Sequence, residues 1–243
     1  MTASVSGPRY AVPEWVEIFD FLQSIDGVAR GYLGTASRRE ANNCDVVAAS
    51  LERCMALIGD AVRLVKSESR ESVGVILRTV YETWLVGTYA SLGGGTARER
   101  LIDQYNFEIR YMLTHLDAPV EEVPTGHEFK IWDYATSVRD LFEELSHPQA
   151  NFSIAAYNSL YRYESLFSIH AGLGSIGLRV SDDDHCSIIN VDPSTDESLR
   201  HRVLLGATLY LALSRSVALC ERLDFSDSQP LEDWVLSLRP EDG

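Results

Sequence analysis

The fold of this protein is decided by residues 72–92, SVGVILRTVYETWLVGTYASL, where apolar side chains cover almost the whole circumference of a predicted helix. A helix of this kind is buried on most of its faces, whereas a surface helix carries a single apolar stripe. Arg78 and Glu82 are its only charged residues. The stretch therefore predicts a central helix in an all-helical core. This helix brings one pair of charged groups into the core.

Helical periodicity continues on both sides of this stretch, and strand signals are nearly absent. The glycine triplet at 93–95 predicts a sharp break, and Pro148 prevents a later helix from continuing. We expect an all-α fold, a single up-and-down bundle of six to seven helices over residues 13–243, with residues 1–12 as a flexible N-terminal tail. Helices are predicted over 14–33, 43–66, 72–92, 96–116, 127–146, 152–173 and 196–223, the third, sixth and seventh forming the centre, followed by a short amphipathic segment over 230–238.

Composition and charge narrow the class of protein. The chain has 243 residues, 45% of them hydrophobic, and 36 acidic against 21 basic residues give a net charge of −15. This is the composition of a globular domain, and the negative balance argues against generic DNA binding. The first twelve residues lack an apolar core of signal-peptide length, and no run of about 18 apolar residues occurs, so we expect no membrane span. The four cysteines show no metal-ligand spacing, which indicates reduced thiols and a cytoplasmic location.

Arg78 and Glu82 lie four residues apart and therefore on the same face of the predicted central helix. An ionised pair among apolar side chains is costly unless the two groups satisfy each other. Either the pair is structural and fixes how the helices pack, or it faces a cleft and takes part in chemistry. If burial is complete, removal of Arg78 would leave Glu82 unpaired, at a cost of about 3–5 kcal/mol.

The helix predicted over 152–173 carries a polar and aromatic stripe. Tyr157, Tyr161, Glu164 and Ser168 follow one another at helical spacing, and His170 lies two residues beyond. Tyrosines in such a pattern line a pocket or an interface, or they belong to a packed core in which their hydroxyl groups find partners. His170 is, in the same way, either a core residue or a general acid or base.

Two further residue spacings, Arg to His and Glu to His, give little information about function. The helical HEPN ribonucleases (higher eukaryotes and prokaryotes nucleotide-binding) have an arginine followed by a histidine after four to six residues, and Arg110–His115 and Arg179–His185 fit that spacing. Chance alone predicts about as many matches in a chain of this composition. Glu144 and His147 could supply half of a di-iron site, but the sequence contains no second Glu-x-x-His pair.

The acidic stretch at Asp182–Asp184 could hold Mg²⁺ through its carboxylates, although its spacing favours a solvated loop. Glycine-rich phosphate loops, dinucleotide fingerprints and the Gly-x-Ser-x-Gly motif of hydrolases are all absent from the sequence. We therefore assign no metal site and no cofactor.

Three segments carry a pattern that extends over about residues 51–174. Arg78 and Glu82 lie in ILRTVYETWLVGTYASL, Arg100 and Tyr105 in RERLIDQYNFEIRY, and Tyr161 and His170 in LYRYESLFSIHAG. Together they resemble the bacterial all-helical family known as domain of unknown function 5677, with a more distant likeness to HEPN bundles. The family pattern has a serine four residues before the histidine, where this chain has Leu166.

We expect the helices over 72–92, 96–116 and 152–173 to bring Arg78, Glu82, Tyr105, Tyr161 and His170 toward one interior cleft. Arg78 would bind an anionic group, Glu82 would orient Arg78, and His170 would be a general acid or base. Tyr161 joins them as a catalytic residue. Arg100 and Tyr105 are the expected substrate-binding residues.

Three functions remain open at this point. The first is an enzyme that acts on a small anionic or nucleotide-like substrate, with a HEPN-like ribonuclease of the defence-toxin type as its sharpest form. The second is a non-catalytic homodimeric interaction protein in which the Arg–Glu pair is structural. The third is a pocket enzyme for an apolar ligand, with Mg²⁺ in the acidic loop.

A homo-oligomer is expected because the segment over 230–238 is too short to be stable alone and must dock on the bundle or on a second subunit.

Overall fold

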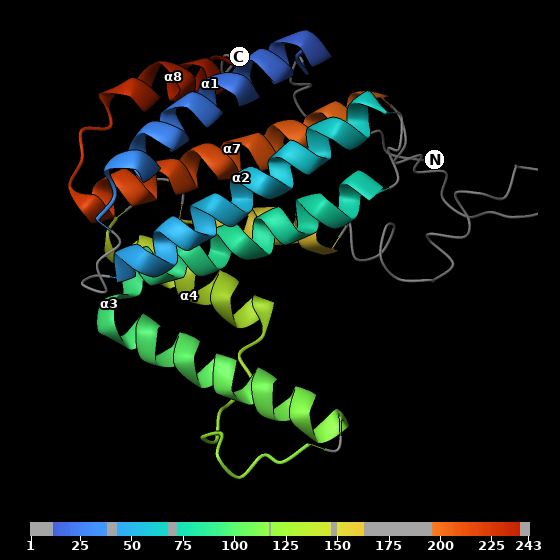
Figure 1. Cartoon of the computed structure of the whole chain (residues 1–243). Helices are drawn as coiled ribbons and strands as arrows, with labels where there is room; N and C mark the ends of the chain where they lie inside the picture. The colour runs from blue at the N-terminus through green and yellow to red at the C-terminus, as the bar shows by residue number, and fades with distance from the viewer. Residues whose placement is uncertain are drawn as a thin grey trace, which may run out of the picture.

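The computed structural model describes residues 12–37, 43–67, 72–116, 118–146, 150–162 and 196–238, and every regular element in them is helical. The helices pack against one another as a bundle (Figure 1), which confirms the all-α prediction. The elements are α1 (Trp15–Thr35), α2 (Cys44–Lys66), α3 (Val73–His115), α4 (Ile131–Glu144), α5 (Phe152–Ala156), the π-helical turn η3 (Tyr157–Arg162), α7 (Asp196–Glu221), the 3₁₀ turn η5 (Ser226–Ser228) and α8 (Gln229–Ser237).

The body of the molecule is built around α7, which packs against α1, α2 and α3. Its apolar face is fully buried together with that of the first half of α3, as Leu209, Leu213, Leu77 and Trp84 illustrate. Among the described helices, α7 alone is long and apolar enough to cross a membrane. Length and composition do not distinguish a core helix from a membrane span, and 56% of its most apolar window is buried inside the bundle.

The glycine triplet breaks the helical conformation and turns the chain sharply, as predicted. Separate helices were predicted over 72–92 and 96–116, and the two helical halves of α3 are indeed separated by a kink at Gly94, whose φ of 55° and ψ of −140° are not helical. The two halves meet at a corner and diverge, so that the second half projects away from the body (Figure 1). We call residues 95–116, together with the loop over 118–130 that returns along them, the arm.

The returning loop packs directly on the backbone of the arm helix. A Cβ atom at Gly126 would lie 2.2 Å from the carbonyl oxygen of Asp103, so only glycine allows this approach. Arg110 donates to the carbonyl oxygen of Val120 at 3.0 Å. Because the loop follows the arm up to Lys130, α4 begins at Ile131 and not at residue 127 as predicted.

The C-terminal amphipathic segment docks on its own chain. In α8 the ring of Trp234 lies 4.4 Å from that of Phe21 in α1, centroid to centroid, and Glu232 forms an ion pair with Arg215 in α7. The sequence predicts that this segment docks either on the bundle or on a second subunit. In the structure it docks on the bundle.

The corner at Gly94 generates the first prediction. The φ and ψ angles of Gly94 lie in a region that side chains with a Cβ atom avoid, yet no described residue outside the local helix backbone comes within 4 Å of the position that a Cβ would take. We expect Gly94→Ala to lower the free energy of unfolding by about 1–3 kcal/mol through backbone strain alone. Urea denaturation of the full chain measures this.

The matched control is Gly95→Ala. Gly95 is exposed, has equally open space around its Cβ position and does not share the positive φ of its neighbour. Alanine should therefore stabilise the helix there, by about 0.5–1 kcal/mol. Equal effects of the two substitutions would contradict a strained corner.

Candidate functional site

Arg78, Glu82 and Tyr161 are in direct contact. The Nε atom of Arg78 donates to Oε1 of Glu82 at 3.0 Å, and its Nη2 atom donates to the hydroxyl of Tyr161 at 3.1 Å. The guanidinium carbon also lies 4.5 Å from the centre of the Tyr161 ring, a distance typical of a cation–π contact. The structure therefore joins residues of α3 and η3 that are 83 positions apart in the sequence.

Other aromatic side chains pack against the ring of Tyr161. Its ring stacks on Tyr157 at 5.0 Å and lies 6.2 Å from Tyr81. Tyr81 donates its hydroxyl to the carbonyl oxygen of Ser153, and burial raises its pKa, so this phenol stays neutral. Tyr157 and Tyr161 both belong to the π-helical turn, a rare conformation that is frequent near functional sites.

The Arg78–Glu82 pair is half-buried. The exposed fractions of the two side chains are 19% and 30%, so complete burial of the pair is ruled out. Water reaches both groups, which lowers the cost of separating them.

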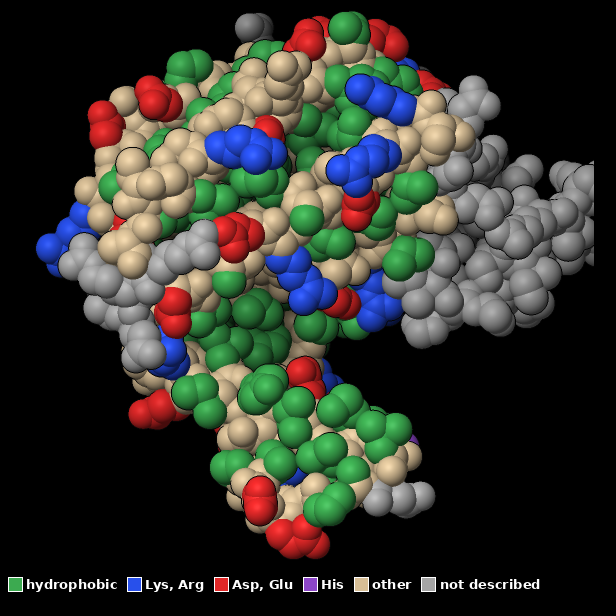
Figure 2. All heavy atoms as spheres, viewed as in Figure 1, with side chains coloured by type: hydrophobic (Ala, Val, Ile, Leu, Met, Phe, Trp, Pro, Cys, Tyr) green, Lys and Arg blue, Asp and Glu red, His purple; other side chains and the backbone are tan. Residues whose placement is uncertain are grey.

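A cleft of about 710 Å³ lies between the arm and the body. Figure 2 shows the notch between the two, with hydrophobic side chains on its walls. Residues of α2, of both halves of α3, of the returning loop and of α4 line it. They are Asp45, Val46, Ala49, Ser50, Arg53, Glu82, Thr83, Val86, Leu101, Gln104, Tyr105, Glu108, Phe129, Ile131 and Tyr134.

Two of the residues expected at the site, Glu82 and Tyr105, line this cleft. Arg78 contacts Glu82 but is not among the lining residues, and Arg100 lies over the ring of Phe129 at 5.3 Å. His170, like the acidic stretch at Asp182–Asp184, lies outside the described residues.

Sequence reasoning missed the contribution of α2. Asp45, Ala49 and Arg53 line the cleft at a spacing of four, which places them on one helix face. That spacing was visible in the sequence, but nothing local indicated that the arm would fold opposite it. Glu108 was missed for the same reason.

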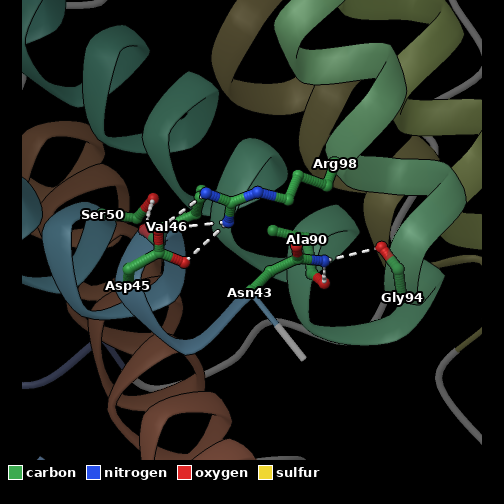
Figure 3. A network of polar contacts seen from close by, with 7 residues as sticks. All are labelled: Asn43, Asp45, Val46, Ser50, Ala90, Gly94 and Arg98. Carbon is green, nitrogen blue, oxygen red and sulfur yellow. Dashed lines mark hydrogen bonds and ion pairs between the residues drawn. The ribbon is translucent and has the colours of Figure 1, made fainter. Parts of the chain in front are cut away.

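Asp45 also ties α2 to the arm. Arg98 makes a bidentate contact with its carboxylate, with nitrogen–oxygen distances of 2.9–3.1 Å (Figure 3). Burial raises the pKa of Asp45, but the hydrogen bond from Arg98 and those from the backbone lower it by more, so that the pKa lies below its usual range. The side chain is thus a carboxylate at neutral pH.

Both members of the Arg110–His115 pair have structural partners. Arg110 is bound to loop carbonyl groups, and Nδ1 of His115 lies 2.8 Å from the carbonyl oxygen of Tyr111. Asp196, the first residue of α7, accepts a hydrogen bond from the indole of Trp15 at 2.9 Å. Within the described part of the chain, no three His, Cys, Asp or Glu side chains gather closely enough to hold a metal ion.

Comparison with known proteins finds no family, no curated protein and no solved structure that matches this chain. The resemblance inferred from the three sequence segments therefore stays a prediction. What is known of the site is its geometry.

The half-buried pair leads to a prediction about stability. Arg78→Ala removes two hydrogen bonds and a cation–π contact, and should lower the free energy of unfolding by about 1–3 kcal/mol, less than a fully buried pair would cost. Tyr161→Phe keeps the ring and should cost only about 0.5–1.5 kcal/mol. Urea unfolding of both variants checks the order, and equal losses would show that neither the Glu82 hydrogen bond nor the ring contact contributes to stability.

The lowered pKa of Asp45 leads to a prediction about pH. The contribution of this carboxylate to stability should be complete above its unfolded-state pKa of about 3.9 and should disappear as the pH falls through the lower folded-state value. The difference in unfolding free energy between the wild type and Asp45→Asn should therefore shrink between pH 7 and about pH 3. A difference that is the same at both pH values would show that the Arg98 contact does not depend on ionisation.

Proposed function

We propose that this protein binds a small organic molecule in the cleft between arm and body, and that the ligand combines an apolar ring with a protonated amine. The observation that carries this proposal is the placement of charge. Three acidic residues, Asp45, Glu82 and Glu108, line the cleft, against one cationic residue, Arg53. Both oxygens of Asp45 accept from Arg98 and Oε1 of Glu108 accepts from Gln104, whereas Arg78 binds only Oε1 of Glu82. Among the charged residues that line the cleft, hydrogen-bond acceptors therefore outnumber donors.

The remaining wall suits the apolar part of such a ligand. Val86, Leu101, Phe129 and Ile131 come from three different segments and converge on the cleft. Binding sites for small molecules are typically apolar concave surfaces of about 300–1,000 Å³ with a few oriented polar groups. The cleft falls within this range of volume.

Glu82 is the best-oriented acceptor. Arg78 binds its Oε1 atom, which fixes the carboxylate, and no described residue is seen to occupy Oε2. An ammonium group that reaches this oxygen would form a charge-assisted hydrogen bond. If the protein is an enzyme, Glu82 is the side chain placed to accept a proton from the ligand.

The anionic or nucleotide-like substrate expected from the sequence has less support. It depended on Arg78 as the group that binds the anion, with Glu82 orienting it; Arg78 does contact Glu82, but it also donates to Tyr161 and is not among the residues that line the cleft. Arg53 is the one cationic side chain among the described lining residues. A HEPN-like ribonuclease would further need His170, which lies outside the described residues.

A pair of probes with the same ring and opposite charge tests the proposal. We expect 1-naphthylmethylamine to bind to the full chain and 1-naphthoate to bind at least about tenfold more weakly, measured by titration calorimetry or ligand-observed NMR. Glu82→Gln should weaken binding of the amine by about fivefold or more, because it removes the charge but keeps the shape.

Asp20→Asn is the control. It removes the same charge from an exposed position on α1, a helix that contributes nothing to the cleft. Tighter binding of the naphthoate, or equal effects of the two substitutions, would overturn the proposal.

A further inference from the structure

The arm carries an apolar stripe that no described residue covers. Ile102, Tyr105, Ile109, Met112 and Leu116 follow at spacings of three, four, three and four. All except Ile109, which is half-buried, are between 48% and 67% exposed. This is the a and d pattern by which helices pair in coiled coils. We call these five residues the arm stripe.

The returning loop occupies the opposite side of the same helix. Gly126 packs on the backbone of Asp103 and Phe107, and Arg110 donates to loop carbonyl groups. The charged side chains of Asp103 and Arg110 are therefore turned toward the loop and away from the stripe. Hydrophobic side chains gather on the arm surface in Figure 2.

A projecting helix of this length is not stable in water by itself, because most helical stability in proteins comes from packing of an apolar face. The loop supplies such packing on one side only. An exposed seam of large apolar side chains on a protruding element is typical of an interaction surface.

We propose that the arm stripe is the interface of a homodimer, in which the arms of two copies pack on each other. A stripe with heptad spacing is complementary to itself, so a twofold axis brings two identical stripes together. Such pairing also suits two copies that each carry a net charge of −15, because the contact is made by uncharged side chains.

The exposed apolar area agrees with a dimer. With about 150–250 Å² for a large side chain, the exposed fractions of the stripe leave roughly 500 Å² per copy. Two copies would bury roughly 1,000 Å² before the polar rim is counted, close to the lower end for specific complexes.

Tyr105 links this surface to the cleft, because it belongs to the arm stripe and also lines the cleft. Dimer formation would therefore cover the outer rim of the cleft. The dimer does not depend on the ligand proposed above, since the stripe is defined by residues that, apart from Tyr105, lie outside the cleft.

Sedimentation of the full chain from about 1 to about 100 µM tests the dimer. The wild type should show a concentration-dependent dimer. Ile102→Glu combined with Met112→Glu should weaken it by about tenfold or more, because four carboxylates would face one another across the twofold axis. Val16→Glu combined with Leu219→Glu is the matched control, since both positions are similarly exposed apolar residues on α1 and α7.

A strict monomer over this range, or stripe variants that dimerise as tightly as the wild type, would overturn the proposal. Hydrogen exchange of the wild type gives an answer that needs no variant. Peptides that cover residues 101–116 should become more protected at the higher concentration. Protection confined to the body would place the interface elsewhere.

Discussion

The structure depends on the corner at Gly94. A helix that bends this sharply leaves backbone carbonyl groups without their usual partners, and buried orphans of this kind are costly. The side-chain amide of Asn43 donates to the carbonyl oxygens of Ala90 at 2.9 Å and of Gly94 at 2.7 Å (Figure 3). One residue that caps the start of α2 therefore binds two carbonyl groups at the kink, and the Arg98–Asp45 ion pair beside it holds the first turn of the arm against α2.

The corner creates the cleft. Glu82 and Tyr105 are separated by 23 residues of one helix, which in a straight helix would span about 35 Å. Because α3 folds back at Gly94, both residues line the same cavity. The cleft is thus a consequence of one residue with positive φ, and its shape follows the angle between arm and body.

The Arg78 cluster shows how a local pair acquires a tertiary role. The spacing of Arg78 and Glu82 predicts their contact in any helix. Tyr161 adds a second hydrogen bond and a ring face to the same guanidinium, and the tyrosines of η3 and α3 fix its position. Arg78 donates to both Glu82 and Tyr161, and the effect is to present Glu82 to the cleft as an oriented carboxylate.

The sequence by itself determined the helical class of the fold, the position of the bend and the Arg78–Glu82 pair, because all three depend on residues within a few positions of one another. Apolar periodicity encodes a helix, a glycine triplet permits a kink, and a spacing of four places two side chains on one face. Only the tertiary structure decided the direction in which the arm leaves the triplet, that the pair is half-buried and that α2 supplies one wall of the cleft. These features depend on contacts such as those of Asn43 with Gly94 and of Arg78 with Tyr161, which join segments far apart in the chain, and local periodicity carries no information about which distant segment will pack opposite.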